Sequence, residues 1–215
     1  NENGWYVSDK VRFRQGTPEK IGGWTRISAN TFLGVCRSLW NWVTTGGANL
    51  LGVGTNLKFY IEQGGVYNDI TPLRASSTIN ADPFAGNGTT TVTVTDTSHG
   101  GSTGDFVTFS GATGTYASIF NAEFQITVLT SDTYTITTGS AIAAGNYGGS
   151  SVVAAYQINI GSELEQPIVG WGAGGWGLGT WGNGGGSSTL PMRLWSQSNF
   201  GDNLIFAYRG GPMYY

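Results

Sequence analysis

A chain of 215 residues with a net charge of −3 and only 11% charged residues lacks the high charge and low hydrophobicity of disordered proteins. Its 36 glycines, eight Trp, ten Tyr and ten Phe are typical of aromatic and β-branched strands joined by tight turns, so we predict an all-β fold. One cysteine excludes an internal disulfide and any multi-cysteine metal site. No apolar run approaches the roughly 18 residues of a membrane span, so we expect no membrane insertion.

The first 75 residues predict successive short strands. Residues 10–14 alternate polar and apolar side chains, a turn follows at 15–18, and residues 19–21 lead to a glycine pair. Further strands are expected at 50–53, 57–61 and 66–70. Strands joined by tight turns and followed by a similar unit are typical of a propeller blade.

Two segments that begin 154 residues apart are nearly the same. Residues 49–60 read NLLGVGTNLKFY, residues 203–215 read NLIFAYRGGPMYY, and Leu-Trp precedes both. A recurring strand–turn–strand unit is typical of repeat architectures, whose units bury their apolar faces on neighbours. Since the second copy stops at Tyr215, we expect a partial propeller-like body and a truncated chain.

Residues 80–160 predict a different unit. Alternating strands rich in Thr and Val are expected at 91–95, 106–109, 124–128 and 134–137, with a closing strand within 152–160. We predict a five- or six-stranded small β-barrel inserted into the propeller-like body. Insertions succeed at exposed loops, so residues 76–80 and 160–161 should be surface loops.

A glycine-rich stretch with a five-residue period follows the predicted barrel. Trp171, Trp176 and Trp181 each begin a Trp-Gly-X-Gly motif, and spaced indoles offer large anchors for another surface. We predict that these three residues are intersubunit aromatic anchors. The expected division is then 1–79 for the first blade region, 80–160 for the barrel, 161–186 for this Gly/Trp-rich loop and 187–215 for the next blade.

Positive charge is concentrated near the start of the chain. Residues 1–75 hold eight Lys/Arg against five Asp/Glu, and residues 76–215 hold two against eight. Strand alternation places Lys10, Arg12 and Arg14 on one face, and Lys20 follows closely. Such a basic row can meet DNA phosphates without sequence preference or pair with acids of a neighbouring subunit.

Patterns that would indicate an enzyme are weak. The glycine spacing at 172–177 fits a dinucleotide motif, but no strand and helix flank it. His99 is the only histidine, which argues against a triad or metal site, and Glu163 with Glu165 would be a carboxylate pair in a turn-rich linker. We expect no catalysis, cofactor or metal, and we expect Cys36 to be a small buried residue.

Long ordered motifs carry a family resemblance. Residues 10–24 (KVRFRQGTPEKIGGW), 51–60, 69–74 (DITPLR) and 199–215 are similar to tail-nozzle proteins of short-tailed phages, including the packaged-DNA-stabilisation type. The resemblance implies a virion tail protein: a β-propeller subunit in a hexameric ring around the DNA, below the portal and adaptor. Its implied partners are copies of itself, neighbouring tail proteins and phage DNA. Residues 104–111 and 132–137 resemble a small β-barrel module frequent in phage structural proteins.

Two other functions remain open from the sequence. The spaced tryptophans and glycine loops suit sugar stacking, so a carbohydrate- or receptor-binding tail module is the alternative. A glycoside hydrolase would require Glu163 and Glu165 to face one cleft.

Overall fold

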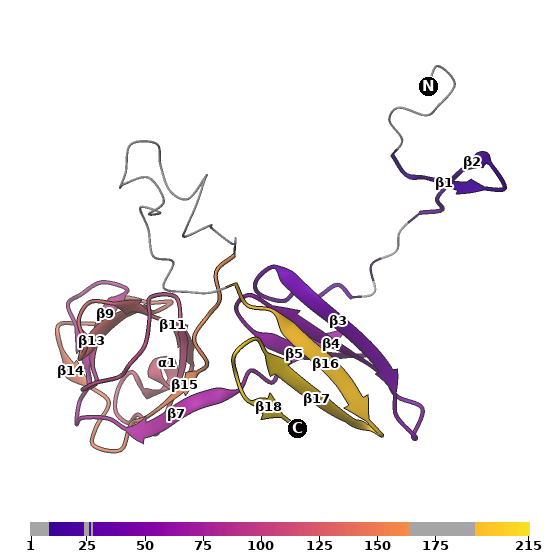
Figure 1. The fold of residues 1–215 in the computed structure, drawn as a ribbon. Helices are drawn as coiled ribbons and strands as arrows, with labels where there is room; N and C mark the ends of the chain where they lie inside the picture. Colours follow the sequence, from indigo (N-terminus) through magenta and orange to yellow (C-terminus); the bar gives the residue numbers. More distant parts are fainter. Residues whose placement is uncertain (1–8, 24–25, 27, 164–191) are drawn as a thin grey trace, which may run out of the picture.

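The computed structural model describes residues 9–23, 26, 28–163 and 192–215. These residues form five antiparallel sheets and one short helix, α1 (Ala117–Phe120), which confirms the predicted all-β class (Figure 1). Residues 164–191 are not described, and they include the predicted Gly/Trp-rich loop from residue 164 onward.

The first blade region forms a four-stranded sheet, which we call the first meander. Its strands are β3 (Cys36–Val43), β4 (Asn49–Thr55), β5 (Phe59–Gln63) and β6 (Val66–Asp69), each paired with the next along the chain. Gly64 and Gly65 both have positive φ between β5 and β6, as a two-residue hairpin turn requires. Neighbouring strands joined by short turns are the blade-like arrangement predicted from the sequence.

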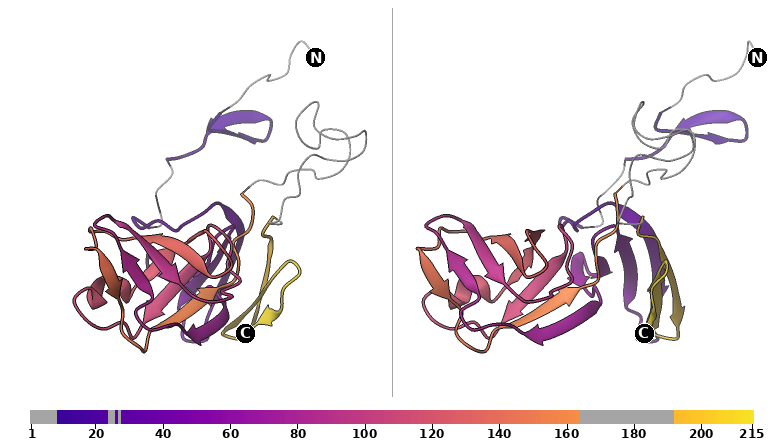
Figure 2. Two further views of the ribbon diagram at one scale, coloured as in Figure 1. Left: turned by 90° about the vertical axis from the view of Figure 1, so that its left-hand side faces the viewer. Right: turned by 60° about the vertical axis from the view of Figure 1, so that its left-hand side comes forward.

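The end of the chain forms a three-stranded sheet, the second meander. It contains β16 (Trp195–Phe200), β17 (Asn203–Tyr208) and β18 (Met213–Tyr214) in sequential order. The repeated sequence therefore occupies β4 and the start of β5 in the first meander, and β17 and β18 in the second. The two meanders lie side by side in Figure 2.

The inserted unit contains two sheets around one core. One has the order β11-β10-β15-β7 and the other the order β12-β13-β9-β8-β14. The first comprises β7 (Leu73–Thr78), β10 (Phe106–Ser110), β11 (Glu123–Gln125) and β15 (Val153–Gln157). The second comprises β8 (Phe84–Gly86), β9 (Thr91–Thr95), β12 (Thr127–Val128), β13 (Thr133–Thr137) and β14 (Gly145–Tyr147).

The alternation of apolar and polar side chains along its strands explains the core of the inserted unit. Val92 and Val94 of β9 are fully buried while the threonines between and beside them point outward. Phe84 stacks on Phe120 with ring centroids 4.0 Å apart, and Phe109 meets Phe84 edge-on at 5.0 Å. Short Thr/Val strands are therefore enough to form the core of the insert, because aromatic residues fill the space between its two sheets.

The structure differs from the predicted closed barrel. No strand of one inserted sheet is paired with a strand of the other among the described residues. The strand expected at 124–128 divides at Ile126, which is 1% exposed, and its halves β11 and β12 join different sheets. Burying Ile126 in the core bends the chain from one layer to the other.

The junctions expected as surface loops are also different. Residues 76–78 belong to β7, which pairs with β15, so the chain enters and leaves the insert through neighbouring strands. Gly161 is buried, and a Cβ there would lie 2.2 Å from Cβ of Arg193. Residues 76–78 are exposed as predicted but form a strand and not a loop, and the second junction was wrong because Gly161 packs on Arg193.

Cys36 was predicted to be buried, and it is exposed. It begins β3, an outer strand of the first meander, and among the described strands β3 pairs only with β4. The general tendency of free cysteine to be buried does not hold at this sheet edge.

Candidate functional site

The predicted basic row lies on a two-stranded hairpin that stands apart from the other sheets in Figures 1 and 2. It consists of β1 (Val11–Arg14) and β2 (Thr17–Lys20), paired antiparallel. Arg12 is opposite Glu19, and Lys20 is opposite Val11. Opposite residues share a face, so Arg12 and Arg14 lie together while Lys20 lies on the other face.

The charges of the hairpin are open to solvent. Arg12 pairs with Glu19 at 3.1 Å, with side chains 61% and 40% exposed. Lys10 precedes β1 with φ of 55° and lies 3.8 Å from Asp9, and both are exposed. Exposed pairs of this kind contribute at most about 1 kcal/mol, so a polyanion can compete for these cations. The structure thus places Arg12 and Arg14 on one face of the hairpin and Lys20 on the other, while Lys10 lies outside β1.

Aromatic residues fill the interface between the two meanders. Phe59 stacks on Phe206 with centroids 4.2 Å apart and planes at 11°, and its centroid lies 4.7 Å from that of Trp195. Trp42 and Leu204 complete this buried cluster with Ile158. Packing of this density fixes one meander on the other.

Two glycines of β4 leave the space that side chains of the second meander occupy. A Cβ at Gly54 would lie 2.5 Å from the Trp195 ring, and one at Gly52 would lie 2.2 Å from Oε1 of Gln197. The Trp195 indole N–H donates to the Thr55 carbonyl at 2.7 Å. Glycine within a strand marks a close approach by another chain segment, and here that segment is β16.

Polar contacts hold the outer end of this interface. The Trp42 indole N–H donates to the Asp202 carbonyl oxygen at 3.0 Å, and the Asp202 carboxylate accepts the Thr45 hydroxyl and amide at 2.7 Å each. The two bonds from Thr45 lower the pKa of the Asp202 carboxyl. Hydrogen bonds therefore join the turn between β16 and β17 to the turn after β3.

A pocket of about 510 Å³ opens beside the meander interface. Asn203 lies at its rim and donates from Nδ2 to the Tyr215 hydroxyl at 2.8 Å. Pockets of this size with mostly apolar walls are the usual form of binding sites. The walls are Ile61, Ile70 and Pro72 of the first meander region and Leu204, Phe206 and Tyr214 of the second.

A buried lysine joins the first meander to the insert. The Lys58 side chain is 3% exposed, and its Nζ lies 2.5 Å from Oδ2 of Asp69. The same Nζ also pairs with Oε1 of Glu123 in β11 and lies 4.4 Å from the centroid of the Phe106 ring. Gln157 Nε2 donates to Glu123 at 3.0 Å. The carboxylates of Asp69 and Glu123 therefore both pair with Lys58.

Acid should weaken this junction. Burial would raise the pKa of Asp69, but hydrogen bonds from Lys58 and Thr71 outweigh it and hold the pKa below its ordinary value. A lowered folded-state pKa stabilises the fold above the ordinary Asp pKa. That contribution is lost as pH falls through the lower folded-state value.

A buried polar network lies inside the insert. The Tyr156 hydroxyl donates to the Asp96 carboxylate and lies 2.8 Å from the Tyr134 hydroxyl. Burial raises the pKa of both tyrosines, so both phenols stay protonated near neutral pH. The network satisfies groups in the core and has the features of a structural element.

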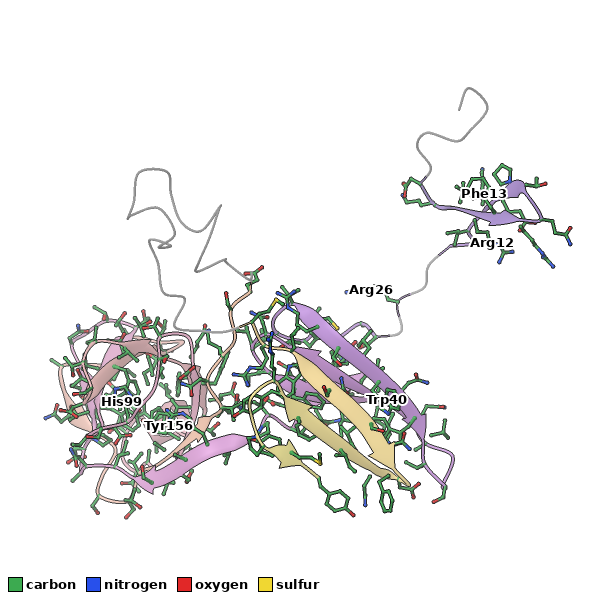
Figure 3. All side chains as sticks on the ribbon, in the orientation of Figure 1. Arg12, Phe13, Arg26, Trp40, His99 and Tyr156 are labelled. Atoms are coloured by element: carbon green, nitrogen blue, oxygen red, sulfur yellow. The ribbon has the colours of Figure 1, made fainter. Side chains whose placement is uncertain are left out.

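His99 belongs to the same region (Figure 3). Its Nδ1 accepts the Gly101 amide at 2.9 Å, and its Nε2 lies 3.0 Å from the Thr130 carbonyl. These partners fit a neutral ring with the proton on Nε2. His99 is 6% exposed and both ring nitrogens have backbone partners, which are the contacts of a structural side chain.

The remaining predicted sites fall largely beyond what the structure describes. Trp171, Trp176, Trp181, Glu165 and the glycine motif at 172–177 lie outside the described residues. Glu163 is exposed, and its carbonyl accepts a hydrogen bond from Arg37.

The described ranges contain neither a metal-binding cluster nor a membrane-spanning helix. No cluster of three or more His, Cys, Asp or Glu side chains is arranged to hold a metal ion. No helix there has the length and hydropathy needed to cross a membrane.

No protein-family model and no curated protein matches the chain. Among solved structures it is similar to one titled "Phage phi92 endosialidase", with 20% identity and a TM-score of 0.34. The match covers 57% of this chain and 18% of that chain.

Proposed function

We propose that this chain is a non-enzymatic structural subunit of a phage tail, and that its copies form a nozzle ring around the DNA. The observation that carries the proposal is the stacking of two meanders built from the same sequence motif. Units of this kind bury their faces on neighbours and suit closed or extended arrays. The proposed partners are further copies, neighbouring tail proteins and DNA within the virion tail.

The basic hairpin supports a sequence-independent contact with DNA. Arg12 and Arg14 share one exposed face of β1, and a guanidinium group can bind a phosphate through two parallel hydrogen bonds. Phosphate contacts made by such groups need no fixed base sequence. A nozzle that conducts DNA requires contacts of this weak and general kind.

Replacing either arginine should reduce the salt dependence of DNA binding. We expect Arg12→Ala and Arg14→Ala each to lower the slope of log K against log salt by about 1 for duplex DNA of mixed sequence. Fluorescence anisotropy at several salt concentrations measures the slope. Arg209→Ala is the control, because it removes one exposed positive charge outside the hairpin. Equal slopes for all four proteins would contradict contact through the hairpin.

Carbohydrate or receptor binding is the competing function, motivated by the regular spacing of Trp171, Trp176 and Trp181. Glycan-array binding that disappears in their alanine variants would favour it over the nozzle.

A further inference from the structure

Lys58 is a buried lysine whose amino group contacts two carboxylates. Its side chain is 3% exposed, and the Phe106 ring lies 4.4 Å from Nζ. Nζ is 2.5 Å from Oδ2 of Asp69 and also contacts Oε1 of Glu123. Since little water reaches this nitrogen, its reaction partners are the groups that touch it. An amine, a carboxyl group that it can attack and a second carboxylate that can carry a proton therefore meet at one buried point.

The Asp69 carboxyl group is oriented for attack by a nucleophile. Its Oδ1 accepts hydrogen bonds from the Thr71 amide at 2.9 Å and the Thr71 hydroxyl at 2.6 Å. The Thr71 hydroxyl also accepts the Phe59 amide at 2.9 Å, so its single proton points to Asp69. Two fixed donors on one oxygen stabilise the negative charge that develops there when a nucleophile adds to the carboxyl carbon. Oδ2, which faces Lys58, is then the oxygen that leaves.

Glu123 is placed to move protons at the same nitrogen. Its Oε1 contacts Nζ of Lys58, while its Oε2 accepts a hydrogen bond from Gln157 Nε2 at 3.0 Å. Gln157 Nε2 also lies 3.4 Å from Oδ2 of Asp69, so one amide group holds both carboxylates beside Lys58. A carboxylate within hydrogen-bond reach of the nitrogen that loses a proton has the geometry of a general base.

We propose that Lys58 and Asp69 condense to form an intramolecular amide bond, with Glu123 as the catalytic proton carrier. One proton passes from Nζ to Oδ2, which leaves a neutral amine beside a neutral carboxyl group. The nitrogen lone pair adds to Cγ of Asp69, and the C=O electron pair moves to Oδ1. Glu123 takes a second proton from the nitrogen and delivers it to the Oδ2 hydroxyl, which leaves with the C–O bonding pair as water while the C=O bond re-forms. The ammonium and the carboxylate thus become one amide and one water, and Glu123 is regenerated.

The ion pair is the state that precedes this reaction. Its hydrogen bonds hold the pKa of Asp69 low, which disfavours the neutral carboxyl group that the attack requires. The condensation is therefore slow although the groups are aligned, and the amide accumulates with time in chains that fold with the ion pair. The bond would join the residue before β5 to the last residue of β6 and close the open end of this hairpin. This inference goes beyond the proposed function and does not depend on ring formation.

Intact mass and a tryptic map of the purified full chain, followed during storage, test the bond. We expect a species lighter by one water molecule whose share rises with time. Trypsin cleaves the unreacted chain after Lys58 into residues 38–58 and 59–74, but it cannot cleave after an acylated lysine. The reacted chain should therefore give residues 38–74 as one peptide that has lost one water. An unchanged mass with complete cleavage after Lys58 would overturn the proposal.

The same map identifies which carboxyl group forms the amide. No lysine or arginine lies between Arg74 and Arg193, so an amide to Glu123 would join residues 38–74 to the peptide 75–193. That branched product would overturn the assignment to Asp69.

Variants separate the amide bond from the ion pair. Lys58→Arg keeps a cation and should lose no water, whereas the control Lys20→Arg, an exposed site, should react as wild type does. Asp69→Asn should lose ammonia in place of water, because an amide nitrogen is then the leaving group. Glu123→Gln should slow the reaction by about a hundredfold or more, as loss of a general base does. Water loss that persists in Lys58→Arg, or equal rates in Glu123→Gln and wild type, would show that the proposed chemistry is wrong.

Discussion

Phe59→Ala should lower the free energy of unfolding by about 3–5 kcal/mol, the usual range for removing a buried phenylalanine side chain. Phe59 is fully buried at the centre of the meander interface. Its ring contacts Phe206 and Trp195 on the other sheet, so the substitution leaves a cavity between the two meanders. Urea unfolding followed by tryptophan fluorescence measures the change.

Phe200→Ala is the matched control for this substitution. Phe200 is 72% exposed at the end of β16, and we expect a change within about 0.5 kcal/mol. A cost below about 1 kcal/mol for Phe59→Ala would mean that the meanders do not pack as described. The stacked-repeat basis of the proposed function would then be lost.

Lys58→Met should cost about 3 kcal/mol at neutral pH, because removing one partner of a buried ion pair leaves the other charge uncompensated. The carboxylates of Asp69 and Glu123 would then lie close together without a cation. Their side chains remain 28% and 33% exposed, which places the expected cost at the lower end of the usual range. The penalty should shrink in acid as the Asp69 carboxylate becomes protonated.

A triple variant separates charge from packing at this junction. Lys58→Met with Asp69→Asn and Glu123→Gln removes all three charges, and we expect stability within about 1 kcal/mol of wild type. Chemical unfolding of the single and triple variants at pH 7 and pH 3 makes the comparison. If the triple variant were as unstable as Lys58→Met at pH 7, the electrostatic account of the junction would be wrong.

Strands with strict alternation could be predicted from the sequence, and short irregular ones could not. The Thr/Val alternation of β9 and β13 has the period of a half-buried strand, and both strands lie where expected. β8 and β14 have three residues each and include Gly86 and Gly145. Such segments carry too few residues to show a period, so their pairing depends on the tertiary fold.

In the candidate sites too, local pattern predicted some of the geometry and the tertiary fold determined the rest. Alternation alone correctly grouped Arg12 with Arg14, but the opposite placement of Lys20 required the register set by the turn at Gln15 and Gly16. The role of Lys58 was missed. A single lysine between Leu57 and Phe59 is its only local signal, and its partner Glu123 lies 65 residues away. Distant pairs of this kind are determined by topology, not by local pattern.

Electron microscopy of the purified chain across a concentration series tests the central claim most directly. The account predicts closed rings whose lumen is wide enough for duplex DNA. The meanders of successive copies should form the continuous wall of each ring. A particle that remains a monomer at every concentration would contradict it.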